Sequence, residues 1–180
     1  MQTHHTKLGP GSLIWQAMLM RMSLAEIVLR DYRETDLEAI YRLDEDCFAA
    51  TFRFDRKAMQ EFAEARNAIC LIAERSGGAI AGFVIVHLDL ETTGLQGYVV
   101  TLDVAETYRR EGVASRLMLE VESRAGAMGV QQMALHVFTG NEGAIRFYER
   151  LGYSQHGVRR RFYRVAGLDA FLYRKELAAF

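Results

Sequence analysis

The 180-residue sequence contains little proline, little cysteine and almost no net charge. A single proline, Pro10, excludes a proline-rich linker or a collagen-like segment. Two cysteines, Cys47 and Cys70, form neither a disulfide framework nor a four-cysteine zinc site, and they predict a reduced, cytoplasmic chain. The 22 Lys and Arg against 23 Asp and Glu argue against nucleic-acid binding through bulk positive charge. Five scattered histidines offer no suitable pair of ligands, so we expect no metal.

Long hydrophobic runs are also absent. The best candidate, residues 13–20, is interrupted by Gln16 and falls short of the roughly 20 apolar residues that span a bilayer. It lacks the preceding basic run and the small-residue cleavage site of a signal peptide. We therefore expect no membrane partner.

The chain length fits one compact domain with an extension. Residues 1–22 are predicted to be a loosely attached N-terminal extension, because they contain the turn sequence Gly9-Pro10-Gly11-Ser12 before any regular pattern. The domain is predicted over residues 23–180. Met22 is an alternative natural start, which the sequence leaves open, as it does the choice between monomer and homodimer.

From residue 26 onward, segments with strand and helix patterns follow one another. Helices are predicted from Thr35, where Thr35 and Glu38 match a capping box, from Asp55 to about Ala65, after Gly112, and from Asn141 to about Leu151. Strands are predicted at residues 26–30, 69–74, 79–87, 97–104, 132–138, from 152, and at 169–177. This order predicts a single α/β domain with a mixed sheet.

The segment from Val99 to Leu119 predicts an anion site. A strand ends, a turn passes through residues 109–114, and an amphipathic helix begins. Such a turn exposes backbone N–H groups at a helix N-terminus, where the macrodipole adds positive potential. Gly112 and Ala114 would let a phosphate approach the backbone. A diphosphate is the most natural ligand, and a plain turn is the alternative.

A second motif, Asn-Glu-Gly-Ala-Ile-Arg-Phe-Tyr-Glu-Arg-Leu-Gly-Tyr, occupies residues 141–153. Together with the R-x-x-G-x-A pattern of Arg109, Gly112 and Ala114, it resembles the GNAT superfamily of acetyl-CoA-dependent N-acetyltransferases. The pattern is most similar to enzymes that acetylate protein N-termini, including the ribosomal-protein-alanine type. This resemblance, over about residues 27–177, implies a GNAT-type domain: a mixed, mostly antiparallel sheet with two splayed parallel strands, flanked by helices.

The resemblance also implies where acetyl-CoA binds. Backbone amides of the turn would hold the diphosphate, and the preceding strand would pair with the pantetheine arm. The amide of Leu102 would face the thioester carbonyl as an oxyanion donor, and Tyr148 would lie beside the sulfur. The implied coenzyme-binding residues are Leu102, Asp103, Val104, Arg109, Arg110, Glu111, Gly112, Val113, Ala114, Ser115, Asn141, Ala144 and Tyr148.

The implied reaction is direct attack of a primary amine on the thioester in a ternary complex. An α-amino group has a pKa near 7.8 and a lysine one near 10.4, so an enzyme for α-amines needs only a mild base such as histidine. Strand alternation places the side chain of His136 on the face of its strand opposite to those of Leu135 and Val137. In the earlier strand it places Tyr98 on the same face as Leu102.

Tyr98 and His136 resemble the pair that eukaryotic and archaeal N-terminal acetyltransferases use through an ordered water. The bacterial ribosomal-protein-alanine enzymes instead carry a glutamate at the position of His136. The implied substrate-binding residues also include Phe48 and Ala49, where these families often have Phe-Pro, and Tyr163, where they place a tyrosine over the peptide backbone.

Three other functions stay open. The same fold can acetylate a lysine or a small-molecule amine. The chain can instead be a CoA-binding regulatory module without catalysis, or a ribosome- or RNA-binding protein that uses the run Arg159–Arg161. Such a run is more often a solvated strand face than a nucleic-acid patch. The expected partners are acetyl-CoA and a protein or peptide N-terminus, without direct nucleic-acid binding. His136 and Tyr148 each also have a plain packing explanation.

Overall fold

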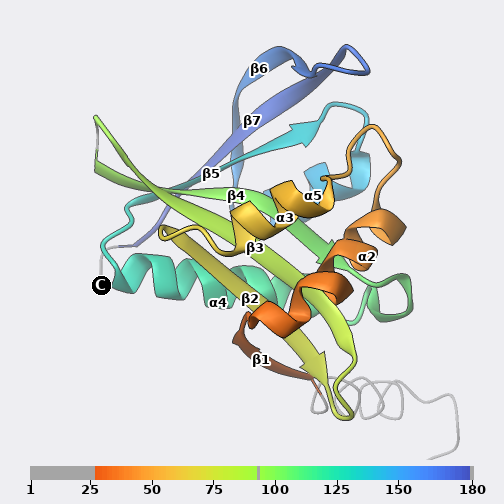
Figure 1. Ribbon diagram of the computed structural model, residues 1–180. Helices are drawn as coiled ribbons and strands as arrows, with labels where there is room; N and C mark the ends of the chain where they lie inside the picture. Colours follow the sequence, from red (N-terminus) through yellow and green to blue (C-terminus); the bar gives the residue numbers. More distant parts are fainter. Residues whose placement is uncertain (1–26, 93, 179–180) are drawn as a thin grey trace, which may run out of the picture.

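The computed structural model describes residues 27–92 and 94–178, so the predicted extension over residues 1–22 lies outside the described residues. The strands are β1 (Ile27–Asp31), β2 (Ala68–Arg75), β3 (Ile80–Glu91), β4 (Gly94–Val104), β5 (Gln132–Phe138), β6 (Ser154–Tyr163) and β7 (Leu168–Glu176). The helices are α2 (Leu37–Cys47), α3 (Arg56–Ala63), α4 (Val113–Ala127) and α5 (Glu142–Arg150), with 3-10 turns at Glu34–Asp36 and Glu106–Tyr108. The predicted order of elements and the mixed α/β sheet are confirmed (Figure 1).

The strands form one sheet in the order β1-β2-β3-β4-β5-β7-β6. Two separate hydrophobic clusters cover its faces. Helix α4 packs Leu117 and Val121 against Val84 on one face, whereas α2 and α3 pack Ile40 and Met59 on the other face. No helix in residues 27–92 or 94–178 is long and apolar enough to cross a membrane.

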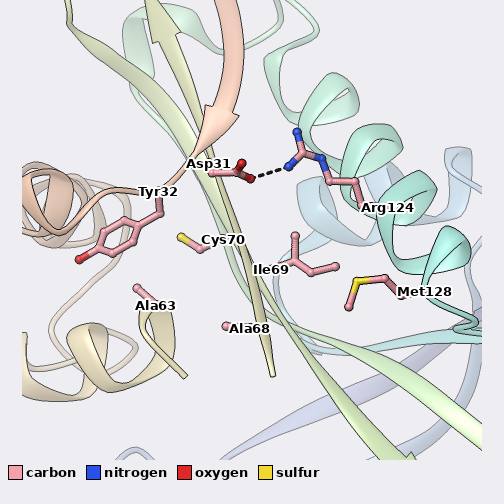
Figure 2. Close-up of a pocket in the computed structure, with 8 residues that line it drawn as sticks. All are labelled: Asp31, Tyr32, Ala63, Ala68, Ile69, Cys70, Arg124 and Met128. Atoms are coloured by element: carbon pink, nitrogen blue, oxygen red, sulfur yellow. Dashed lines mark hydrogen bonds and ion pairs between the residues drawn. The ribbon is translucent and has the colours of Figure 1, made fainter. Parts of the chain in front are cut away.

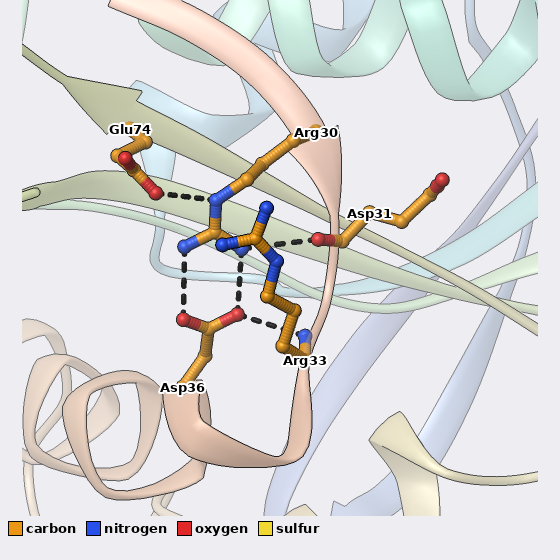
Figure 3. A network of polar contacts seen from close by, with 5 residues as sticks. All are labelled: Arg30, Asp31, Arg33, Asp36 and Glu74. Carbon is orange, nitrogen blue, oxygen red and sulfur yellow. Dashed lines mark hydrogen bonds and ion pairs between the residues drawn. The ribbon is translucent and has the colours of Figure 1, made fainter.

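The junction between β1 and α2 is fixed by a charged network (Figure 3). The Arg30 guanidinium donates to both oxygens of Asp36, at 2.6 and 2.9 Å, and also pairs with Glu74 on β2. Asp36 accepts the backbone N–H of Arg33 at 2.8 Å. The predicted cap at Thr35 is therefore wrong: the chain enters α2 through a 3-10 turn, and Asp36, held by Arg30, accepts the N–H of Arg33 immediately before that turn.

A β-bulge in β4 changes which side chains share a face. Val86 pairs with Val99 and Ile85 pairs with Thr101, so Val100 is an extra residue in the strand. Val100 packs on the side of α2 and α3, whereas Leu102 packs on the side of α4. The prediction that Tyr98 and Leu102 share one face is wrong, because one extra residue reverses the alternation.

Strands β4 and β5 run parallel and then separate. Their pairing is confined to Gln96–Tyr98 with residues 132–134, which leaves a gap beside the C-terminal half of β4. At the end of β4, the N–H of Ala105 donates to Ala81 on the side of β3, at 2.9 Å. Since successive amides of a strand point to opposite edges, the N–H groups of Val104 and Leu102 point toward the gap.

Candidate active site

The turn before α4 has the backbone conformation of an anion-binding loop. Arg110 has φ 65° and Gly112 has φ 83°, both in the left-handed region. Gly112 precedes the helix and offers no side chain to cap it, and the first helical hydrogen bond runs from Arg116 N–H to Gly112. The N–H groups of residues 113–115 therefore lack an intrahelical acceptor and give the N-terminus of α4 its positive end. Arg109 lies beside this turn, with its Nε donating to the Val104 carbonyl at 3.1 Å.

The predicted pair of Tyr98 and His136 is in contact. Tyr98 Oη lies 3.0 Å from His136 Nδ1, and the Phe162 ring stacks on the imidazole with centroids 4.3 Å apart. Burial, and then the charge of Arg159, lowers the pKa of His136 below 6.5. Burial raises the pKa of Tyr98 to about 12. At neutral pH the imidazole is therefore uncharged and the phenol keeps its proton.

Tyr148 lies on α5 and is buried against Tyr153, with ring centroids 5.6 Å apart. Burial raises its pKa above 10, and the charge of Asp103 adds to the effect. Tyr148 belongs to the same hydrophobic cluster as Leu102 and Val104 of β4. A protonated phenol here can donate a hydrogen bond or a proton.

The start of α5 is set by Asn141. Its side-chain oxygen accepts the N–H of Ala144 at 3.0 Å, as a helix cap does. A hydrogen bond from Asn141 to a coenzyme acceptor, as predicted, would use its side-chain nitrogen, which is the donor of the amide group.

An aromatic cluster joins the α2–α3 loop to β6. Phe52 lies with its ring centroid 4.7 Å from that of Tyr163 and 5.4 Å from that of Phe138. The loop also contains the predicted residues Phe48, half-buried, and Ala49, exposed. Sequence reasoning did not identify Phe52, because its partners lie about a hundred residues away in the chain and no local motif marks it.

Two buried carboxylates, Asp44 and Asp103, lie beneath this loop. Asp44 accepts the N–H of Phe54 at 3.1 Å, and Asp103 accepts the hydroxyl of Thr101 at 3.1 Å. Burial raises the pKa of Asp44 to about 6, and burial together with Asp44 raises the pKa of Asp103. Asp103 is 1% exposed, and its backbone groups lie on the edge of β4 that pairs with β3, so the free protein presents no group of Asp103 to the gap.

A groove with a volume of about 390 Å³ runs along the sheet beside the pair. Its walls include Tyr98 and His136 together with Arg159 of β6, which belongs to the arginine run noted in the sequence. Leu172 and Arg174 of β7 also line it, and the sequence reasoning did not single them out. In the described parts of the chain, no group of three histidine, cysteine or acidic residues has the arrangement of a metal site.

A second pocket lies elsewhere, between the ends of β1, β2, α3 and α4 (Figure 2). An ion pair between Asp31 and Arg124 crosses its rim, and Ile69 and Met128 line it. Burial raises the pKa of the Cys70 thiol in this pocket to about 12. Cys70 is therefore a packing residue and not a nucleophile, and this pocket is separate from the Tyr98 groove.

Comparison with known proteins agrees with this architecture. Residues 37–153 match the Acetyltransferase (GNAT) family. N-alpha-acetyltransferase RimI of Mycobacterium tuberculosis is 33% identical over 105 residues, which are 58% of this chain and 65% of the relative, just under two thirds of its length. The ribosomal-protein-S18-alanine N-acetyltransferase of Escherichia coli has a similar structure, with a TM-score of 0.75 and 22% identity over 86% of this chain and 96% of the other. Arabidopsis thaliana NAA60 in complex with a bisubstrate analogue has a TM-score of 0.75 and 24% identity over 86% of this chain and 99% of the other.

Proposed function

Because the chain belongs to the Acetyltransferase (GNAT) family, we propose that it transfers an acetyl group from acetyl-CoA to the N-terminal α-amine of a protein or peptide. The observation that carries this choice of acceptor is the contact of 3.0 Å between Tyr98 and an uncharged His136 at the edge of a groove. A base that titrates below 6.5 suits an α-amine, which is already partly neutral at pH 7. The names of the mycobacterial relative and of the Escherichia coli structure support the same acceptor class.

Acetyl-CoA is proposed to lie in the gap between β4 and β5. Its diphosphate would accept hydrogen bonds from the N–H groups of residues 113–115 at the start of α4. Its pantetheine arm would follow the edge of β4, where the N–H groups of Leu102 and Val104 face the gap. The Leu102 N–H would then polarise the thioester carbonyl.

The proposed reaction begins with removal of a proton from the substrate ammonium. If His136 Nδ1–H donates to the Tyr98 oxygen, the Nε2 lone pair is free to take that proton, directly or through a water molecule. The amine then attacks the carbonyl carbon, and the Leu102 N–H stabilises the oxyanion. Collapse breaks the carbon–sulfur bond, and the thiolate takes a proton from Tyr148 Oη. This last task is light, because a thiol of pKa about 8.5 is a fair leaving group. The second proton that the attacking nitrogen releases as it becomes an amide returns to Tyr148 through water.

The test is a thiol-release assay with peptide pairs that differ only in a free or an acetylated N-terminus, each containing an internal lysine. We expect release of CoA thiol with the free N-termini and loss of activity with the blocked ones. Equal activity on blocked peptides would identify lysine as the acceptor, and activity on small amines alone would identify a small-molecule enzyme. Tight acetyl-CoA binding without thiol release on any amine would favour a regulatory module.

A further inference from the structure

Two arginines of the groove lack a carboxylate partner. Arg174, on β7, has its Nε buried without a hydrogen-bond acceptor. Arg159, on β6, is exposed and lies over the ring of Phe162, with Cζ 5.7 Å from the centroid. Within the described residues, neither guanidinium belongs to an ion pair. A buried guanidinium N–H without an acceptor has lost its hydrogen bonds to water, and an oxygen of a ligand can replace them.

Arg174 belongs to the same cross-strand row as Tyr98. Tyr98 pairs with Ala134, and Ala134 pairs with Arg174, so Arg174 lies two strands from Tyr98, a distance of about 10 Å. The residue between them, Ala134, is small, and all three residues line the groove. No large side chain of this row therefore separates Tyr98 from Arg174.

The groove has an excess of positive charge. Arg159 and Arg174 line it, and among its described lining residues Glu91 alone is acidic. The charge of Arg159 extends to the reacting pair, since it contributes to lowering the pKa of His136. A peptide with its first residue beside Tyr98 that continued along the sheet would reach the two guanidinium groups within its first three residues, since extended peptide advances about 3.4 Å per residue.

We propose that this groove recognises an acceptor peptide with an acidic side chain at its second or third residue, and that Arg174 and Arg159 bind the carboxylate. The inference rests on the proposed function and names its substrate class. Guanidinium and carboxylate form paired, charge-assisted hydrogen bonds, which are stronger than bonds between neutral groups. The amine of the first residue would then lie at Tyr98 and His136, and the acidic residue would fix the direction of the chain along the groove.

The experiment compares kcat/KM for amidated heptapeptides that share their first residue and carry Asp or Asn, or Glu or Gln, at the second or third position. Amidation removes the terminal carboxylate as a competing ligand. We expect the wild type to prefer the acidic member of a pair by about tenfold at low salt, and less at high salt. Arg174→Gln and the exposed Arg159→Gln should each reduce this preference. Arg160→Gln removes a neighbouring exposed charge that does not line the groove, and should leave the preference in place.

Each result has a definite meaning. Equal kcat/KM for acidic and amide peptides, or a preference that survives in both Arg174→Gln and Arg159→Gln, would overturn the inference and leave the proposed function standing. Thiol release with none of the free N-termini would overturn the proposed function and this inference with it. Arg159→Gln keeps the test valid if Arg174→Gln does not fold, which a thermal melt detects.

Discussion

At the scale of single residues, the chemistry depends on protonation states that burial sets. His136 is uncharged because the sheet and Arg159 disfavour its cation, and Tyr98 and Tyr148 keep their protons because burial disfavours their anions. These three residues therefore offer one base and two hydrogen-bond donors near neutral pH. Two predictions test these assignments separately.

Replacing His136 by glutamine should lower kcat by about a hundredfold, the lower end of what a general base contributes, because an α-amine needs little help. The dissociation constant of acetyl-CoA, measured by calorimetry, should stay within about twofold. The wild-type rate should rise with pH as His136 loses its proton, through a pKa below 6.5. The rate of the variant should not show this rise. His156→Gln, at an exposed position on β6, is the matched control. Unchanged kcat in His136→Gln would remove His136 from the mechanism.

Replacing Tyr148 by phenylalanine should reduce kcat only a few fold, since the leaving thiolate is stable enough to depart without an acid. Single-turnover kinetics of thiol release measures the step directly. A loss of more than about a thousandfold would show that proton donation by Tyr148 controls the reaction, contrary to the role assigned here.

At the scale of elements, the α2–α3 loop is tied to a buried carboxylate. The native pKa of Asp44 is about 6, above its ordinary 3.8, so the folded protein binds this proton more tightly than the unfolded chain does. Stability due to this group is therefore greatest below about pH 4 and falls as pH rises toward 6.

Asp44→Asn should remove this decrease of stability with rising pH, because asparagine does not ionise. Its side-chain oxygen can still accept the Phe54 N–H. At pH 8 the variant should be more stable than the wild type, by at most about 3 kcal/mol, and the difference should shrink toward pH 4. Urea unfolding at both pH values measures it. Asp46→Asn, exposed on the same helix, should show no such trend. A variant less stable than the wild type at pH 8 would contradict the role of Asp44.

The turn before α4 provides a second test at this scale. Gly112→Val should weaken acetyl-CoA binding by more than tenfold, because a β-branched side chain strains a φ of 83° and occupies the space beside the free amides. Calorimetry gives the affinity. Gly129→Val imposes similar strain at φ 93° just beyond the other end of α4, and should lower stability without changing the affinity. Equal affinities in the two variants would exclude the turn as the diphosphate site.

Much of this layout could be predicted from the sequence, and the failures have physical causes. Periodicity and turn residues were sufficient for the strands and the helices, whereas the pairing of Tyr98 with His136 followed from the family resemblance. The bulge at Val100 was not predicted. The alternation of side chains within β4 does not reveal that this strand has one residue more than the segment of β3 with which it pairs. Phe52 and Arg174 were not identified, because their importance arises from contacts between distant segments.

At the scale of the whole molecule, the sheet consists of two parts, β1–β4 and β5–β7, joined along a short parallel pairing. In hydrogen exchange, we expect the amides of Leu102 and Val104 to exchange rapidly in the free protein and slowly with bound acetyl-CoA. The paired amides within β2 and β3 should change little and serve as the internal control. Ligand protection confined to other regions would contradict binding in the gap.

In the proposed complex, the divergence of β4 from β5 would make the bound coenzyme a part of the sheet. A pantetheine arm bonded to the free edge of β4 behaves as an additional strand, and it would stiffen a sheet that is weakest at its centre. Each catalytic cycle would then loosen the middle of the protein when the spent thiol leaves and tighten it again when a new thioester arrives. Departure of the product and relaxation of the protein would be a single event.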